Sequence, residues 1–281
     1  MFTIEALAKI NLTLEVLGKR PDGYHEIRSV IQTLKFCDTL QISPGKDILF
    51  TSTLPDWSPE QSLVSRAIKL LQEATGCAKG TTIEITKPIP LMSGLGGDSS
   101  DAAAVLQGLN QLWKLGLTQQ KLQEITQKLG SDVTFFLAGG TVLMEGRGEK
   151  ITSLTPMPHQ WVILIFPKIP ILPGKTKRLY NTLKPSYYTD GKITDKLISE
   201  IKSGKEFNTS LLCNIFENVV FTQGEELAKY REDILKIGAP NVHLAGSGPT
   251  LFTLLENKSQ AKELLTQLKN QGIEAILTET L

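Results

Sequence analysis

The residues with the clearest potential for chemistry lie at positions 90–104, which read PLMSGLGGDSSDAAA. Gly94, Gly96 and Gly97 crowd the middle of this stretch. Glycines let a backbone approach an anion closely and adopt positive φ. The residues that follow, Asp98, Ser99 and Ser100, are all good helix N-caps. A helix N-terminus carries unpaired N–H groups and partial positive charge. The stretch predicts a phosphate-binding loop, with a tight turn capped by its own serines as the alternative.

The sequence on either side of this loop supports the prediction. Residues 81–89 alternate as a strand does, and Pro88 and Pro90 end that run. After the loop, apolar residues recur with the spacing of one buried helical face, at Ala102, Leu106, Leu109 and Trp113. The expected order is therefore strand, glycine loop and helix N-terminus, which is the arrangement of a phosphate cradle.

Two common nucleotide-binding loops do not fit the sequence. A Walker A loop requires G-x-x-x-x-G-K-[ST], and the GKT at residues 174–176 has Ile169 where the first glycine should stand. A Rossmann loop requires an acidic residue about 20 positions further on. That region holds Lys114 and Leu115 instead. A dinucleotide-dependent oxidoreductase is therefore disfavoured.

Other candidate residues lie outside the loop. Lys9 and Asn11, within AKINL, share one side of an N-terminal strand because side chains alternate with a period of two. That side is either solvated or buried, and a buried lysine requires a partner. Tyr24 and His25 lie side by side at the end of a loop, where they either stack on a ring or complete the edge of the core. Asp132, in GSDVTFF, is either the N-cap of a short helix or a functional carboxylate in apolar surroundings.

The composition indicates an ordinary globular enzyme or binding protein. The chain has 281 residues, of which 41% are hydrophobic and 21% charged, and this length accommodates two domains. With a net charge of +1, the chain lacks the excess of positive charge that is typical of nucleic-acid-binding proteins. The N-terminus reads as a strand rather than a signal peptide, and no apolar run approaches the roughly 20 residues that span a bilayer. The three cysteines and three histidines are scattered, so we expect reduced thiols, a cytoplasmic location and no metal cluster.

The coarse pattern of elements predicts two α+β domains, at residues 1–153 and 154–281, joined by a proline-bearing linker at 152–160. In the first, we expect strands at 2–16, 27–36, 39–43, 48–53, 139–145 and 149–152, and helices at 59–75 and 118–129. In the second, we expect strands at 161–166 and 273–277, a strand–glycine turn–strand at 242–256, and helices at 175–183, 194–201, 258–270 and 215–237, the last broken near 222–225. The second pattern is typical of a ferredoxin-like domain.

Three motifs together resemble the GHMP small-molecule kinases. These are AKINL, the P-x-x-x-G-L-G-G-x-S-S loop and a late AGSGPT turn, which spread over nearly the whole chain. The resemblance implies a two-domain α+β fold, with an N-terminal domain like ribosomal protein S5 and a C-terminal ferredoxin-like domain. GYHE and GSDVTFF are most similar to the branch of the family that uses ATP and Mg²⁺ to phosphorylate the 2-hydroxyl of 4-diphosphocytidyl-2-C-methyl-D-erythritol, in the non-mevalonate isoprenoid pathway.

Residue roles follow from this resemblance position by position. Lys9 and Asp132 would be the catalytic pair. The ATP phosphates would be held by Pro90, Leu91, Met92, Ser93, Gly94, Leu95, Gly96, Gly97, Asp98, Ser99 and Ser100. The cytidyl substrate would contact Asn11, Tyr24, His25, Thr176 and Tyr180, with the last tyrosine stacking on cytosine. Gly246, Ser247 and Gly248 would form a third glycine turn beside the active site.

The loop departs from the family pattern at two positions, since Met92 and Asp98 stand where the family usually has glycine. We expect Met92 to remove the freedom to adopt positive φ at this position, at little other cost. The Asp98 carboxylate would repel a triphosphate unless it points away, caps the helix or binds Mg²⁺. Two other interpretations remain, namely a GHMP kinase for mevalonate, homoserine or a sugar, and a non-catalytic RNA-binding module. The favoured partner is a small cytidyl diphosphate, with no nucleic acid or membrane, and the protein is expected to be a monomer or weak homodimer.

Overall fold

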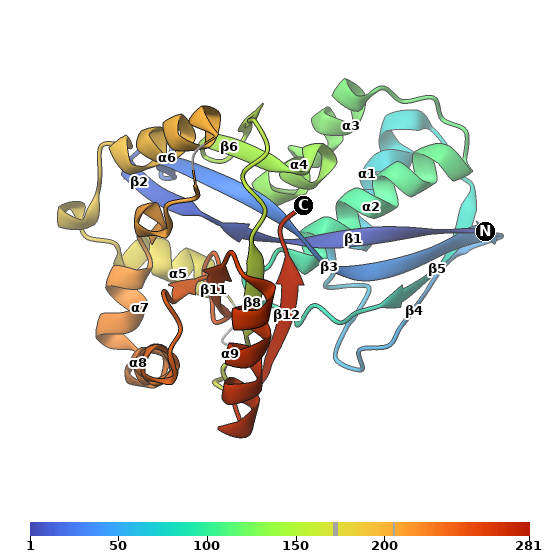
Figure 1. Cartoon of the computed structure of the whole chain (residues 1–281). Helices are drawn as coiled ribbons and strands as arrows, with labels where there is room; N and C mark the ends of the chain where they lie inside the picture. Colours follow the sequence, from blue (N-terminus) through green and yellow to red (C-terminus); the bar gives the residue numbers. More distant parts are fainter. Residues whose placement is uncertain (171–173, 205) are drawn as a thin grey trace. The chain divides into compact units, whose positions relative to one another are not determined.

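The computed structural model describes residues 1–170, 174–204 and 206–281 (Figure 1). The chain forms two compact units. The first unit comprises Met1–Ala8, Phe36–Leu91 and Gly96–Gly139, and the second comprises Lys9–Lys35, Met92–Leu95 and Gly140–Leu281. Two long strands, β1 (Phe2–Asn11) and β3 (His25–Gly45), contribute residues to both units. Each compact unit is built from non-contiguous segments of the chain. The predicted domain boundary at residue 153 therefore stays a prediction.

The first unit packs four helices on a small mixed sheet (Figure 1). Residues 39–45 of β3 pair antiparallel with β5 (Gly80–Thr86), which pairs in parallel with β4 (Ile48–Ser52). The helices are α1 (Leu63–Thr75), α2 (Gly97–Leu112), α3 (Gln119–Thr126) and α4 (Ser131–Ala138). One apolar cluster fills the space between these helices and the strands, and it includes Leu40, Ile83, Ile68 and Leu106. The core thus fixes the position of α2, the helix that follows the glycine loop.

Helix α2 is the central helix of the first unit, and it is buried on most of its surface. The predicted apolar face is confirmed, since Ala102, Leu106, Leu109 and Trp113 are all buried. Gly108 allows the helix to approach the strands closely, because an added Cβ there would lie 2.9 Å from the Cδ1 atom of Ile4. A side chain at this position would have to displace the ends of the Ile4 and Ile42 side chains.

The described residues of the second unit contain two groups of strands. In the first group, residues 25–28 of β3 pair antiparallel with β2 (Thr13–Lys19), and residues 27–32 pair antiparallel with β6 (Thr141–Gly146). Strand β7 (Lys150–Ser153) pairs with β6, and the short β9 (Cys213–Asn214) pairs in parallel with β2. Strand β2 therefore lies between β3 and β9.

The second group is the predicted ferredoxin-like sheet. Its strand order is β10 (His243–Leu244), β11 (Leu251–Leu255), β8 (Trp161–Ile165) and β12 (Ala275–Glu279), with every neighbour antiparallel. Helix α9 (Lys258–Asn270) packs on this sheet (Figure 1). The other helices of the unit are α5 (Lys175–Thr182), α6 (Lys192–Ser203), α7 (Glu217–Gln223) and α8 (Glu225–Ile237), with short 3₁₀ turns at Pro185–Tyr187 and Thr209–Leu211.

Several predicted boundaries are wrong. The strands expected at 27–36 and 39–43 are one continuous strand, β3, because different partners pair along its length. The helix expected from residue 59 starts at Leu63, after its N-cap Ser62. Asp132 is not an N-cap, because Gly130 holds that position and Asp132 lies in the first turn of α4. No helix in the described parts of the chain is long and apolar enough to cross a membrane.

Candidate active site

The glycine loop leads into α2 through Gly96, which is the N-cap of the helix and adopts φ 78°. The predicted N-caps Asp98, Ser99 and Ser100 are therefore not caps; they lie inside the first turn or just beyond it. The reason is that glycine takes the left-handed conformation without steric cost, so the helix can begin earlier than the serines suggest. The first amides of α2 lack partners within the helix and are available to an anion.

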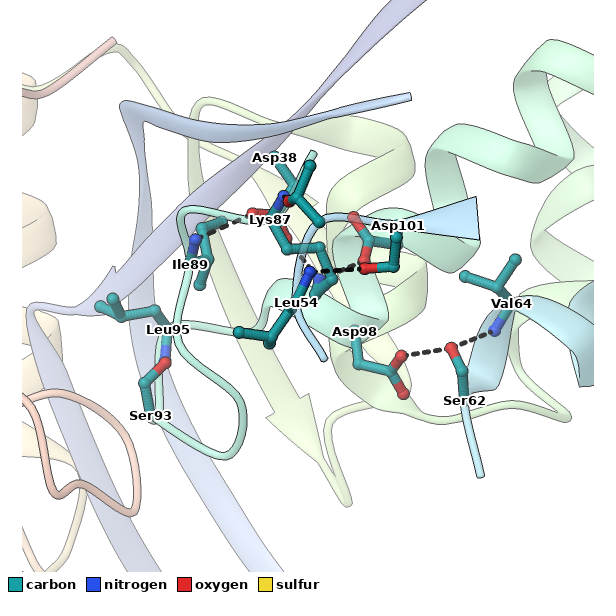
Figure 2. Close-up of polar contacts among 12 residues, drawn as sticks. Asp38, Leu54, Ser62, Val64, Lys87, Ile89, Ser93, Leu95, Asp98 and Asp101 are labelled. Carbon is teal, nitrogen blue, oxygen red and sulfur yellow. Dashed lines mark hydrogen bonds and ion pairs between the residues drawn. The ribbon is translucent and has the colours of Figure 1, made fainter. Parts of the chain in front are cut away.

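The Asp98 carboxylate points toward the start of α1 (Figure 2). Its Oδ1 accepts a hydrogen bond from the Ser62 hydroxyl at 2.5 Å, and its Oδ2 accepts one from the Leu63 amide at 2.9 Å. Ser62 in turn accepts from the Val64 amide at 3.1 Å. Asp98 thus helps to cap α1, and its carboxylate interacts with the start of that helix rather than with the backbone of the glycine loop.

Replacing Asp98 with alanine should lower the free energy of unfolding by about 1–2 kcal/mol, the usual cost of losing a helix cap. The KM for ATP should stay close to that of the wild type, because the Asp98 side chain is engaged at α1. Urea unfolding and initial-rate kinetics measure the two effects separately. A large rise in the KM for ATP without a loss of stability would show that the carboxylate acts on the nucleotide instead.

The backbone of Met92 adopts the positive φ that a methionine was expected to disfavour. It adopts φ 52°, in the left-handed region that favours glycine. Non-glycine residues pay roughly 1–2 kcal/mol for this conformation, so the loop carries backbone strain at this position. The Met92 side chain is 55% exposed, and burial of the side chain therefore does little to offset the cost.

A buried ionic cluster lies beside the loop in the first unit (Figure 2). The Lys87 ammonium lies 2.6 Å from Oδ2 of Asp38 and 2.5 Å from Oδ2 of Asp101. Asp38 also accepts a hydrogen bond from the Ile89 amide at 2.9 Å. Asp38 is on β3, Lys87 and Ile89 follow β5, and Asp101 is on α2. The cluster therefore ties the entry of the glycine loop to the helix at its exit.

The charges in this cluster do not balance if both carboxyls are ionised. Burial raises the pKa of Asp101 to about 7, an effect that the Lys87 ammonium opposes and the Asp38 carboxylate reinforces. Burial acts to lower the pKa of Lys87, but the two carboxylates outweigh it and raise that pKa. Among the described residues, Oδ1 of Asp101 has no hydrogen-bond partner. The lysine therefore stays charged, and the cluster favours one bound proton near neutral pH.

In the second unit, Lys9 and Asn11 share a buried face of β1, as the period of two predicts. The Lys9 ammonium donates to Oδ1 of Asn11 at 2.8 Å, and the Asn11 amide donates to the Ser29 hydroxyl at 2.9 Å. Lys9 and Asn11 are only 4% and 5% exposed, which excludes the solvated alternative. Ser29 was not predicted as part of the site. It orients Asn11, which in turn orients Lys9.

The loop segment Met92–Leu95 packs on the third glycine turn within the second unit. The Thr250 amide donates to the Ser93 carbonyl at 3.2 Å, and the Lys9 amide donates to the Leu95 carbonyl at 3.0 Å. Gly94 adopts φ 90°, and an added Cβ there would overlap the carbonyl oxygen of Ala245. At Gly246 an added Cβ would lie 3.1 Å from the Lys9 ammonium nitrogen. Glycine at both positions lets the two backbones meet beside Lys9.

Asn214, which was not predicted as part of the site, supports the third glycine turn. Its side-chain amide donates to the carbonyls of Leu244 and Gly246, at 2.9 and 2.7 Å, and its Oδ1 accepts from the Phe216 amide at 3.0 Å. Ser247 is held separately, by a 2.9 Å contact between its hydroxyl and that of Thr176. The sequence feature that could have indicated Asn214 is a single amide side chain within the apolar run LLCNIF.

The aromatic residues predicted to contact the base lie in the second unit, but they pack on one another. The rings of His25 and Tyr180 are stacked, with centroids 5.1 Å apart and planes 21° apart. Tyr188 and Phe216 add edge contacts to His25 and Tyr180 respectively. Tyr24 is 58% exposed and faces the Arg147 guanidinium at 4.8 Å. A base cannot fit between His25 and Tyr180 at this spacing, so it must stack on an outer face or separate them.

The predicted catalytic residues belong to different units, Lys9 to the second and Asp132 to the first. Each is described in its own unit. Asp132 lies in the first turn of α4, two residues after the N-cap Gly130. The pairing of the two residues remains a prediction.

Two family models match this chain. The GHMP kinases N terminal domain matches residues 62–140, and the GHMP kinases C terminal domain matches residues 197–274. These matches include the glycine loop, Asp132 and the third glycine turn, and they cover more than half of the chain. The chain belongs to the GHMP kinase family.

Its relatives indicate one branch of that family. A protein of Dehalococcoides mccartyi is 49% identical over 281 residues, covering 100% of this chain and 99% of the relative. A protein of Bacillus pumilus is 40% identical over 268 residues, covering 94% and 92% respectively. Both are named 4-diphosphocytidyl-2-C-methyl-D-erythritol kinase. A crystal structure of 4-(cytidine 5′-diphospho)-2C-methyl-D-erythritol kinase superposes with a TM-score of 0.84 at 29% identity, covering 99% of both chains.

Proposed function

We propose that this protein transfers the γ-phosphoryl group of ATP to the 2-hydroxyl of 4-diphosphocytidyl-2-C-methyl-D-erythritol, forming the 2-phosphate and ADP. The observation that carries the proposal is the geometry around Lys9. The buried lysine is oriented by Asn11, and two glycine-bearing segments meet beside its ammonium group. The full-length similarity to kinases of this name supports the same acceptor over mevalonate, homoserine or a sugar. It also argues against a non-catalytic RNA-binding module.

The loop and α2 would bind the phosphates of ATP. The backbone amides at the start of α2 donate to phosphate oxygens, and the partial positive charge of the helix N-terminus favours the polyanion. Asp98 does not oppose this binding, because its carboxylate accepts hydrogen bonds from Ser62 and Leu63. The Asp38–Lys87–Asp101 cluster holds the two ends of the loop in place. Positioning of this kind supplies most of what phosphoryl transfer requires from a protein.

Asp132 would accept the proton of the 2-hydroxyl, and Lys9 would stabilise the charge that develops on the transferred group. Asn11 and Ser29 keep the Lys9 side chain in one orientation.

Magnesium would neutralise charge on the ATP phosphates. Within the described residues, no group of three acidic, histidine or cysteine side chains could hold a metal ion without the nucleotide. Mg²⁺ is commonly held by one or two protein oxygens together with substrate phosphates, so the residues present fit an ion that arrives with ATP. The Ser99 hydroxyl, in the first turn of α2, is the loop oxygen that we assign to it, because Ser100 is buried.

Tyr180 would provide a stacking face for cytosine. Replacing it with alanine should raise the KM for the cytidyl substrate by roughly 5- to 100-fold, the range expected for losing one stacked base. The KM for ATP should change much less. Initial rates at fixed saturating ATP, and then at fixed saturating acceptor, separate the two constants. An unchanged KM for the cytidyl substrate would refute the stacking role.

The cellular setting follows from the reaction. A soluble phosphorylated metabolite as product favours a cytoplasmic enzyme. The proposed chemistry requires a single chain, so we propose a monomer or weak homodimer.

The direct test of function is ADP release from MgATP with 4-diphosphocytidyl-2-C-methyl-D-erythritol, mevalonate, homoserine or galactose as the acceptor. Release with the cytidyl acceptor alone supports the proposal. Release with another acceptor, or with none of them, would overturn it.

A further inference from the structure

Lys175 belongs to the GKT motif that fails as a Walker A loop and that no part of the proposed function uses. It is the first residue of α5, after Gly174, which adopts φ 71° as the N-cap. The helix directs its side chain to the glycine-bearing segments of the second unit. The Lys175 ammonium donates to the Met92 carbonyl at 3.0 Å and also to the Gly248 carbonyl. One lysine thus contacts both the phosphate loop and the third glycine turn.

The surroundings of Lys175 leave its positive charge uncompensated. In the described part of the chain, the hydrogen-bond partners of its ammonium are two neutral carbonyl oxygens. Burial and the nearby Lys9 ammonium lower the pKa of Lys175 to about 8. Two lysines therefore direct like charges to the place where Gly94 and Gly246 meet. Such an arrangement is costly without an anion, and a phosphate group removes the cost.

We propose that Lys175 is a phosphate-binding residue of this active site, and that it contacts the triphosphate of ATP. The proposal rests on the proposed function. The donor is favoured over the diphosphate of the acceptor because Met92, which Lys175 contacts, is part of the loop that leads to the N-terminus of α2. An ammonium group has three N–H donors. Two are used by the carbonyls of Met92 and Gly248, so one remains for a phosphate oxygen.

A purely structural role would give Lys175 the same two carbonyl bonds but would not need its charge. The variants Lys175→Gln and Lys175→Arg separate the two roles, because glutamine keeps N–H donors without charge and arginine keeps the charge. Lys177→Met is the matched control, since Lys177 is an exposed lysine on the same helix. Thermal unfolding of each variant checks that the fold is retained.

The experiment is equilibrium binding of MgATP and, separately, of cytidine 5′-diphosphate, with adenosine and cytidine as probes that lack phosphate. We expect Lys175→Gln to weaken MgATP binding by at least about tenfold, the loss that corresponds to one charge-assisted hydrogen bond. Lys175→Arg should recover most of the affinity, and Lys177→Met should match the wild type. Adenosine binding should not change.

A comparable loss for cytidine 5′-diphosphate alone would support a phosphate-binding lysine but overturn its assignment to ATP. If Lys175→Gln binds both nucleotides as tightly as the wild type does, the proposal is overturned. An equal loss for adenosine would also overturn it, because the lysine would then act only by shaping the loop. Binding is measured without turnover. A wild-type protein that binds MgATP but phosphorylates no acceptor would therefore count against the proposed function alone.

Discussion

Replacing Asp132 with asparagine should lower kcat by at least about 100-fold, because asparagine cannot accept the proton of the acceptor hydroxyl. Asparagine has nearly the shape of aspartate, and the backbone of α4 does not depend on the charge, so the variant should fold. Its thermal midpoint should lie close to that of the wild type. The measurement is the single-turnover rate and kcat with saturating MgATP and cytidyl acceptor.

Asp98→Asn is the matched control for this variant. Asp98 and Asp132 both lie in the first turn of a helix, α2 and α4 respectively, but the Asp98 carboxylate is engaged by Ser62 and Leu63. Asp98→Asn should therefore keep most of its turnover and lose some stability. Near-normal turnover of Asp132→Asn would exclude Asp132 as the general base. Equal losses in both variants would indicate a general effect of charge near the phosphates.

Replacing Lys87 with methionine should lower the free energy of unfolding by about 3–5 kcal/mol, the usual cost of removing one partner from a buried ion pair. The substitution leaves the carboxyls of Asp38 and Asp101 facing each other with no cation between them. The loss should be larger at pH 8 than at pH 5. In the unfolded chain both carboxyls ionise near their ordinary pKa, whereas the folded variant must keep protons on them, so its stability falls as the pH rises.

Urea unfolding at the two pH values measures this effect. Lys69→Met, at an exposed position of α1 in the same unit, should change stability by no more than about 0.5 kcal/mol. The triple variant Lys87→Met/Asp38→Asn/Asp101→Asn should recover much of the loss, because it removes the unpaired charges and keeps an oxygen for the Ile89 amide. A small loss for Lys87→Met that does not depend on pH would show that the cluster is not an ionic anchor.

The sequence alone predicted the parts of the fold that depend on local patterns. Helix α9 has the predicted bounds, and the strand β8 and helix α5 differ from prediction by a single residue at one end. Helical periodicity, an N-cap such as Asn257 and a run of apolar residues act within a few positions, so they can be read directly. The same holds for Lys9 and Asn11, whose shared face follows from strand geometry.

The structure decided what depends on contacts between distant segments. The continuity of β3 arises because β2, β5 and β6 pair with different parts of it. The start of α2 at Gly97 follows from the left-handed conformation of Gly96, and Met92 adopts its positive φ where its carbonyl accepts a hydrogen bond from Lys175. No local propensity of methionine or serine indicates either feature.

The features of the candidate site also divide into those that the sequence predicts and those that only the tertiary structure shows. The sequence by itself determined that a glycine loop precedes a helix, and that a lysine and an asparagine lie on one strand face. Only the tertiary structure decided that Asp98 caps α1, that Lys87 holds Asp38 and Asp101, and that Lys175 contacts Met92 and Gly248. The physical reason is that a charge is stabilised by whatever partner folding brings within a few ångströms, and these partners come from parts of the sequence that share no local pattern.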